Sequence, residues 1–171
     1  MALEHGAPAG HHWSMTTTPT ALLSRTWFAA DMPADVCARM AAIADVVDIP
    51  SGGIVVQEGL ACRSLGVVLS GRIALRLTVP GLGDRTLVTV DEGDVFGWSA
   101  LLPGSAATST GVALVPTQVL EFEREALAAA LAADCELAAA VYQRVLIAVA
   151  RRLQATRLQL LDLYRAGDEP W

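Results

Sequence analysis

Few side chains in this sequence have the type and the spacing that catalysis or metal binding requires. All three histidines, His5, His11 and His12, lie near the start, so the rest of the chain offers no imidazole for a metal site or for a Ser-His-Asp arrangement. All twelve basic residues are arginines, which excludes a lysine-dependent phosphate loop or Schiff base. The three cysteines lack metal-like or redox-like spacing. The sequence therefore predicts neither an enzyme nor a metal or cofactor site.

Any remaining functional residues must be positioned by helices and strands, which are predicted from a hydrophobic periodicity that changes along the chain. Residues 1–20 are rich in glycine, proline, threonine and histidine without any period, and we expect a mobile tail. Between Val46 and Phe122, short apolar runs alternate with turn signals about every ten residues, which is typical of a sandwich or barrel. Residues 97–107 interrupt this rhythm with a short piece that is not a strand. The fold class is therefore mainly β with flanking helices, over residues 21–133.

Helical periodicity flanks these strands on both sides. Pro33 followed by Val36 and Met40 predicts a short helix before them. After them we expect one helix over Glu123–Ala133 and a long one over residues 134–165 with Asp134 as its N-cap.

The long helix carries side chains at alternating intervals of four and three residues: Tyr142, Leu146, Val149, Leu153, Thr156, Leu160 and Leu163. A seven-residue repeat of this kind is typical of a coiled-coil seam, so we expect a parallel homodimer formed through this helix. The alternative is an apolar stripe that covers the mouth of its own barrel.

The order of these elements and four short motifs resemble the cyclic-nucleotide-binding domain family, in particular catabolite activator/Fnr-like sensors. The motifs are PSGGIVVQEG at 50–59, LSGRI at 69–73, GDVFG at 93–97 and ARRLQAT at 150–156. The resemblance implies a double-stranded β-helix barrel (jelly-roll, cupin-like) followed by a long dimerisation helix. Catabolite-type regulators carry a helix-turn-helix after that helix, and we expect none here because the sequence ends at Trp171.

The resemblance makes GDVFG the start of a phosphate-binding cassette, and this cassette departs from the family pattern at both charged positions. The family places a glutamate on the ribose hydroxyl and an arginine on the cyclic phosphate, aided by backbone N–H groups at a short helix start. Here Trp98 holds the glutamate position and Ser105 the arginine position. Loss of one buried charge partner typically costs ~3–5 kcal/mol, or roughly 10²–10³ in affinity. The degenerate ligand site implied by the resemblance comprises Phe96, Gly97, Trp98, Ser99, Ala100, Ser105, Ala106 and Thr108.

Several roles stay open at this stage. Trp98 can fill the sugar pocket, stack on a flat ligand other than a cyclic nucleotide, or face outward towards a partner. An arginine from elsewhere can replace the missing one, and the candidates are Arg72, Arg76 and Arg152. The resemblance also implies Arg152, Thr156 and Arg157 as residues of the long helix that cap the ligand, although Thr156 equally suits a polar seam position.

The composition of the chain argues against some classes of binding partner. The formal net charge of -6 and the pI of about 4.9 argue against nucleic acid and anionic membranes. The absence of a long apolar run and of a secretory signal favours the cytoplasm. We predict a stand-alone ligand sensor that binds a nucleotide-like or anionic small molecule and signals through its dimer helix to an unidentified protein partner. The alternatives are a ligand-free scaffold domain with a filled pocket, and a cyclic AMP binder that uses a substitute arginine.

Overall fold

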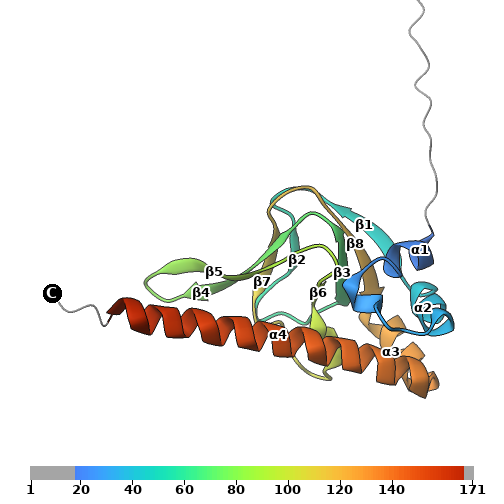
Figure 1. Cartoon of the computed structure of the whole chain (residues 1–171). Coiled ribbons are helices and arrows are strands. Elements are labelled where there is room, and N and C mark those ends of the chain that lie inside the picture. Colours follow the sequence, from blue (N-terminus) through green and yellow to red (C-terminus); the bar gives the residue numbers. More distant parts are fainter. Residues whose placement is uncertain (1–17, 168–171) are drawn as a thin grey trace, which may run out of the picture.

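The strands form two antiparallel four-stranded sheets that face each other (Figure 1). The computed structural model describes residues 18–167, with side chains described as far as residue 161. One sheet has the order β1-β8-β3-β6 and the other β2-β7-β4-β5. The strands are β1 (Asp45–Ile49), β2 (Ile54–Val56), β3 (Ser64–Ser70), β4 (Ile73–Val79), β5 (Gly83–Val90), β6 (Val95–Phe96), β7 (Thr110–Ala113) and β8 (Thr117–Glu123). This is the predicted jelly-roll barrel.

Alternation along the strands separates two cores. Val68 and Val119 point between the two sheets into an inner core, which also contains Ile73, Leu75, Val90 and Phe96. Val67 and Leu120, the chain neighbours of these two residues, point to the opposite face and into an outer core shared with the helices. β3 is therefore buried over most of its length, because both of its faces are covered.

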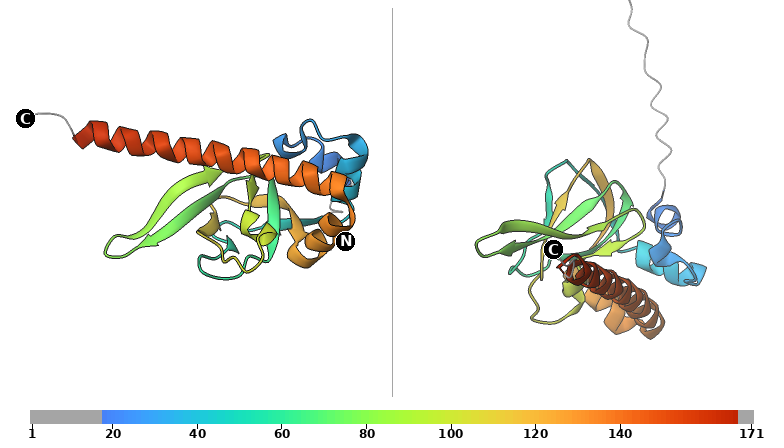
Figure 2. Two further views of the ribbon diagram at one scale, coloured as in Figure 1. Left: turned by 90° about the horizontal axis from the view of Figure 1, so that it is seen from below. Right: turned by 60° about the vertical axis from the view of Figure 1, so that its left-hand side comes forward.

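Helices cover the outer face of the first sheet (Figures 1 and 2). They are α1 (Pro19–Leu23), the 3-10 helix η1 (Trp27–Ala29), α2 (Ala34–Ala41), α3 (Arg124–Ala133) and α4 (Cys135–Gly167), while a second 3-10 helix, η2 (Trp98–Leu101), follows β6. α2 begins directly after Pro33 and buries Val36 and Met40, as predicted. Of the predicted tail over residues 1–20, residues 1–17 lie outside the described residues, and Pro19 begins α1.

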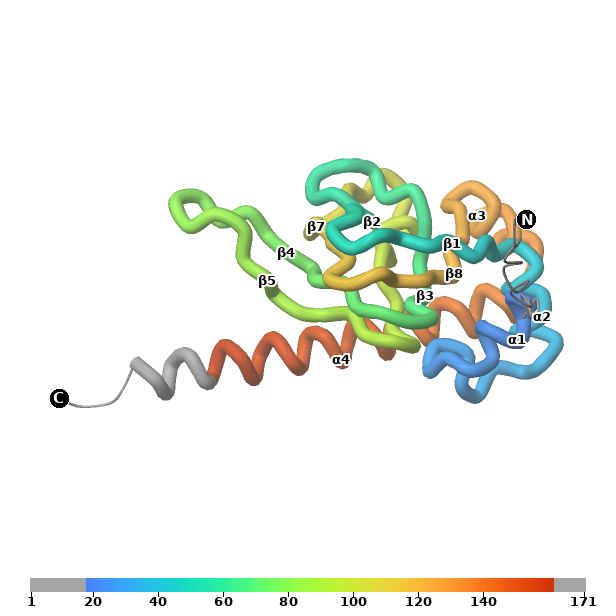
Figure 3. The backbone as a smooth tube through the Cα atoms, turned by 90° about the horizontal axis from the view of Figure 1, so that it is seen from above, coloured from blue at the N-terminus to red at the C-terminus, as the bar shows by residue number. Residues whose placement is uncertain are grey.

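The long helix α4 begins at the predicted residue. The Asp134 side chain caps it by accepting hydrogen bonds from the backbone N–H groups of Glu136 (3.1 Å) and Leu137 (3.0 Å). Its first half buries one face on the outer core through Leu137, Val141, Val145 and Ala148. From Leu153 to residue 161 every described side chain is exposed, and this half of α4 projects beyond the barrel in the same general direction as the β4–β5 hairpin (Figures 1 and 3).

Most of the predicted seam lies away from the barrel, although Val149 is half-buried and packs against the outer core. Tyr142, Leu146, Leu153 and Leu160 are 50%, 68%, 51% and 52% exposed. These positions are offset from the buried face of α4, so the alternative in which the seam covers its own barrel is wrong for them. The side chain of Leu163 lies outside the described residues.

Candidate ligand cassette and an adjoining cavity

The cassette runs from β6 into η2, and two glycines allow it to lie close against β3. Gly97 adopts a left-handed backbone with φ of 70°, and a Cβ at this position would overlap the carbonyl oxygen of Ser64. A Cβ at Gly66 would overlap the ring of Phe96. The Cys62 thiol donates to the carbonyl oxygens of Ser64 (3.3 Å) and Gly97 (3.4 Å), which fixes the turn from β6 into η2.

The second half of the cassette is tied to the loop that precedes β3. Ala106 forms an antiparallel bridge with Ala61. The Ala107 N–H donates to the carbonyl of Leu60 (2.8 Å), and the carbonyl of Ala107 accepts from Gly59 (2.9 Å). The second half of the cassette therefore pairs with residues 59–61 much as a short strand would.

The predicted cassette residues occupy different environments. Phe96, Ser99 and Ala100 are buried, Gly97, Trp98 and Ser105 are half-buried, and Ala106 and Thr108 are exposed. The backbone N–H of Ala100 donates to the carbonyl of Gly97 (2.9 Å), so this amide is already engaged within η2.

Trp98 does not lie in the barrel interior, where the first of its three predicted roles, filling the sugar pocket, would place it. The indole packs against the outer core beside the helices, and other residues line the cavity next to the cassette. The left-handed turn at Gly97 sends η2 towards the helices, which explains why Trp98 does not fill a pocket inside the barrel.

Of the arginines considered as substitutes, Arg152 reaches the cassette. Its guanidinium donates to the carbonyl oxygen of Val95 in β6. Burial lowers the pKa of the Arg152 guanidinium, and the nearby Asp94 carboxylate partly opposes this effect. Arg72 instead pairs with Asp91 at the surface, and Arg76 lies half-buried on β4 opposite Thr86 and Thr110.

The other two candidates on the long helix lie apart from the cassette in this chain. Thr156 is exposed, and its hydroxyl donates to the carbonyl of Arg152 one turn earlier (2.9 Å). Arg157 is also exposed. Arg152 is therefore the one of the three predicted capping residues that the structure brings to the cassette.

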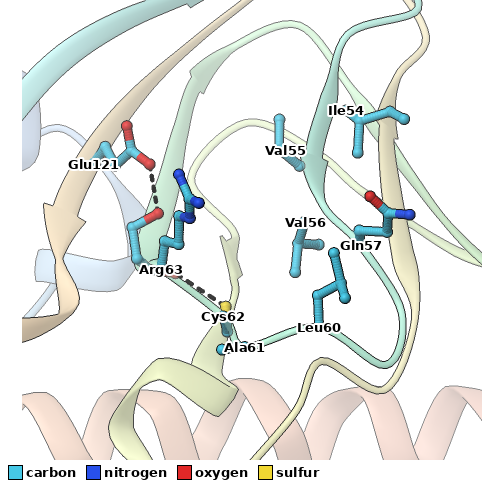
Figure 4. Close-up of a pocket in the computed structure, with 10 residues that line it drawn as sticks. Ile54, Val55, Val56, Gln57, Leu60, Ala61, Cys62, Arg63 and Glu121 are labelled. Atoms are coloured by element: carbon cyan, nitrogen blue, oxygen red, sulfur yellow. Dashed lines mark hydrogen bonds between the residues drawn. The ribbon is translucent and has the colours of Figure 1, made fainter.

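A cavity of about 410 Å³ lies beside the cassette, between β2 and β3 (Figure 4). Its polar side chains are Gln57, Arg63, Ser64 and Glu121, and the Ser64 hydroxyl donates to the Glu121 carboxylate. The remaining lining residues are Ile54, Val55, Val56, Leu60, Ala61 and Cys62.

Sequence reasoning missed this cavity, since none of its lining residues was predicted as part of a site. One signal was present at Glu121. It lies in the apolar run Val119–Phe122, two residues after Val119, where strand alternation directs it to the barrel interior. No comparable signal marks Arg63, which lies just before β3.

Comparison with known proteins agrees with this geometry. The family model described as the cyclic nucleotide-binding domain matches residues 46–134, from β1 to the end of α3. The chain belongs to the cyclic nucleotide-binding domain family. The match includes the whole cassette and every lining residue of the cavity.

This cyclic nucleotide-binding domain is also similar to individual proteins. It is 26% identical over 117 residues to a CRP-like cAMP-activated global transcriptional regulator of Mycobacterium tuberculosis, a match that covers 68% of this chain and 50% of the regulator. The chain thus spans about half the length of the curated relatives it matches.

Solved structures have the same fold. A cyclic nucleotide-binding domain from Methylobacillus flagellatus KT has a TM-score of 0.73 at 20% identity, covering 85% of this chain and 82% of that one. The N-terminal domain of a transcriptional regulator from Streptomyces coelicolor A3(2) has a TM-score of 0.62 at 28% identity, with coverage of 79% and 94%. Within the described part of the chain, no helix has both the length and the apolar character of a membrane span.

Proposed function

We propose that this cyclic nucleotide-binding domain is a regulatory ligand sensor without enzymatic activity, which binds a nucleotide-like or anionic small molecule at residues 96–108. The cassette lacks the family's glutamate and arginine, so cyclic nucleotides bind weakly or not at all. The output is a movement of α4 that is read by a protein partner in the cytoplasm. The curated relatives support a regulatory role, because they are described as transcriptional regulators.

The contact between Arg152 and Val95 carries this proposal. The guanidinium belongs to α4, and the carbonyl that it binds belongs to the strand that enters the cassette. Because burying a guanidinium costs free energy unless it is hydrogen-bonded, an anionic ligand at the cassette competes with Val95 for Arg152. Ligand binding therefore changes a contact that fixes α4 on the barrel.

A second route links the cassette to α4 through Trp27. The Trp27 backbone packs against Gly93, at the turn that precedes β6. The Trp27 ring lies 4.0 Å from the Arg151 guanidinium and 5.9 Å from that of Arg144, both on α4. Arg144 also pairs with Asp31 (3.0 Å). A displacement of β6 thus reaches α4 by two routes, one through Arg152 and one through Trp27.

Thermal unfolding with and without ligands tests the proposal. A panel of cyclic AMP, cyclic GMP, other nucleotides and small anions is screened, and a ligand at 100 times its Kd is expected to add ~2.7 kcal/mol, or several degrees in Tm. The variant Arg152→Met should lose most of this shift, whereas Arg157→Met should keep it. A shift with cyclic AMP that depends on Arg152 would identify a cyclic AMP sensor with a substitute arginine.

A flat response across the panel contradicts the sensor and favours a ligand-free scaffold domain. The packing of Val68, Val90 and Phe96 against one another between the sheets supports this second candidate. Ser105→Arg separates the two, because it restores a cation at the family's arginine position. A gain of tenfold or more in cyclic AMP affinity would argue against a filled pocket.

A further inference from the structure

The cavity between β2 and β3 contains a carboxylate with an incomplete set of partners. Glu121 is half-buried and points to the barrel interior, and its Oε1 atom accepts a hydrogen bond from the Ser64 hydroxyl. Among the described residues, no arginine lies within ion-pair distance of Glu121. Since a half-buried carboxylate is costly without a cation, this position favours a positively charged partner in the cavity.

A second carboxylate strengthens this preference. Asp45 of β1 lies directly opposite Glu121 of β8 in the antiparallel pairing. Like charges at directly opposed positions of a sheet repel each other and destabilise the pair. A bound cation at this point of the sheet removes that repulsion.

The same cavity carries a guanidinium. Arg63 lines it, is exposed, and forms no ion pair with any described residue. In Figure 4 the Arg63 side chain extends towards the end of the cavity at which Glu121 lies. A guanidinium offers a planar pair of donors that matches a carboxylate.

Apolar residues form the opposite wall. Val55 and Val56 of β2 lie across from β3, and Leu60 lies below them (Figure 4). A smaller cavity of about 140 Å³ shares Val55 and Glu121 and continues inward to Phe96 and Val119. The main cavity, at about 410 Å³, falls within the range of about 300–1,000 Å³ of small-molecule sites.

We propose that this cavity binds a small zwitterion of the apolar α-amino acid class. The ammonium group pairs with Glu121, the carboxylate pairs with Arg63, and the apolar side chain lies along Val55 towards the smaller cavity. The main cavity, which holds both charged groups of the ligand, is separate from the proposed cassette site because no residue between 96 and 108 lines it; the smaller cavity meets the cassette at Phe96. The main cavity can therefore be occupied whether or not the cassette binds a ligand.

Thermal unfolding and calorimetric titration with L-leucine and L-methionine test the proposal on the full chain. Each amino acid at 10 mM is expected to raise the Tm by about 3 °C or more if its Kd is well below that concentration. Two leucine analogues test the two charges of the ligand one at a time: leucinamide lacks the carboxylate, and 4-methylpentanoate lacks the ammonium group. Neither should bind within tenfold of leucine, because each leaves one charge of the site unpaired.

Three variants locate the effect. Glu121→Gln keeps an acceptor for Ser64 but removes the charge, and Arg63→Gln removes the guanidinium; both should weaken leucine binding tenfold or more. Arg85→Gln, an exposed arginine on β5, is the control and should bind as the parent does. None of these changes should alter the response to nucleotides, so failure here and failure at the cassette are distinguishable.

The proposal is overturned if no apolar amino acid binds the parent protein, if leucinamide binds as well as leucine, or if both cavity variants keep full affinity. If Glu121→Gln does not fold, backbone amide NMR shifts of the parent decide the matter. Leucine should then perturb residues 54–57 and 60–64 before any other part of the domain, and perturbations confined to other residues would contradict the site.

Discussion

Single residues without a side chain determine where the cassette can lie. Gly97 combines a left-handed backbone with contact against the Ser64 carbonyl, so it is restricted twice, by its torsion angle and by space. Gly104, in the same cassette, shares the left-handed backbone (φ of 71°) but has open space where a Cβ would stand. Substitutions at these two glycines can therefore distinguish the cost of backbone strain from the cost of steric overlap.

This pair gives a prediction at the scale of the residue. Gly97→Ala should lower the free energy of unfolding by about 2–4 kcal/mol, because β6 and β3 must move apart, whereas Gly104→Ala should cost only about 1 kcal/mol. Urea unfolding followed by circular dichroism measures both. Equal losses would mean that the contact with Ser64 contributes nothing.

At the scale of the element, helix α3 depends on a charged cap. The Glu123 carboxylate accepts hydrogen bonds from the N–H groups of Ala126 and Glu125, both at 2.9 Å, and these bonds lower the pKa of Glu123 below its ordinary value of 4.5. A lowered folded-state pKa means that this stabilisation is complete above the ordinary value. It is lost as the pH falls through the lower folded-state value.

The stability of the parent relative to Glu123→Ala should therefore be constant at neutral pH and shrink below about pH 4.5. Denaturant unfolding between pH 3 and pH 7 measures this difference. Glu123→Ser is the control, because a hydroxyl caps the helix without titrating in this interval. A difference from Glu123→Ala that stays unchanged down to pH 3 would refute the role of the carboxylate.

The elements also show what the sequence could predict. Local periodicity and capping residues place both ends of α3 and the start of α4 within one residue, since these signals are read within one turn of helix, whereas the end of α4 lies two residues beyond the predicted one. The direction in which a side chain points relative to the other helices and strands cannot be read from its neighbours in the sequence. Trp98 lies beside the helices because of one glycine torsion, and Arg63 lines a cavity because β2, from the other sheet, lies opposite it. The GDVFG motif therefore predicts the turn from β6 into η2, but the cavity residues required the tertiary structure.

At the scale of the whole molecule, α4 presents two distinct faces. One face packs on the outer core through Val141 and Val145, and the predicted seam on another face leaves Leu146 and Leu153 exposed. Apolar side chains repeated every seven residues at the surface are typical of a helix that pairs with a second copy. This pattern supports the homodimer predicted from the heptad repeat, which remains a prediction.

The double variant Leu146→Glu, Leu153→Glu should convert a dimer into a monomer, as measured by sedimentation equilibrium, and weaken association by 100-fold or more because it places like charges in the seam. Leu158→Glu is the matched control, since Leu158 is similarly exposed but lies outside the heptad positions. A parent protein that is monomeric at high micromolar concentration would rule out the seam as an interface.

If ligand binding tilts α4 as proposed, Arg152 is the pivot and the part of the helix beyond it is the lever arm. Beyond that residue the helix has no buried side chain as far as residue 161, and it covers about 14 Å at a rise of 1.5 Å per residue. A tilt of about 10° at the pivot would move the backbone at Leu161 by about 2 Å. A shift at Val95 too small to reorganise the barrel would thus become a displacement large enough to change which side chains meet across a helical interface.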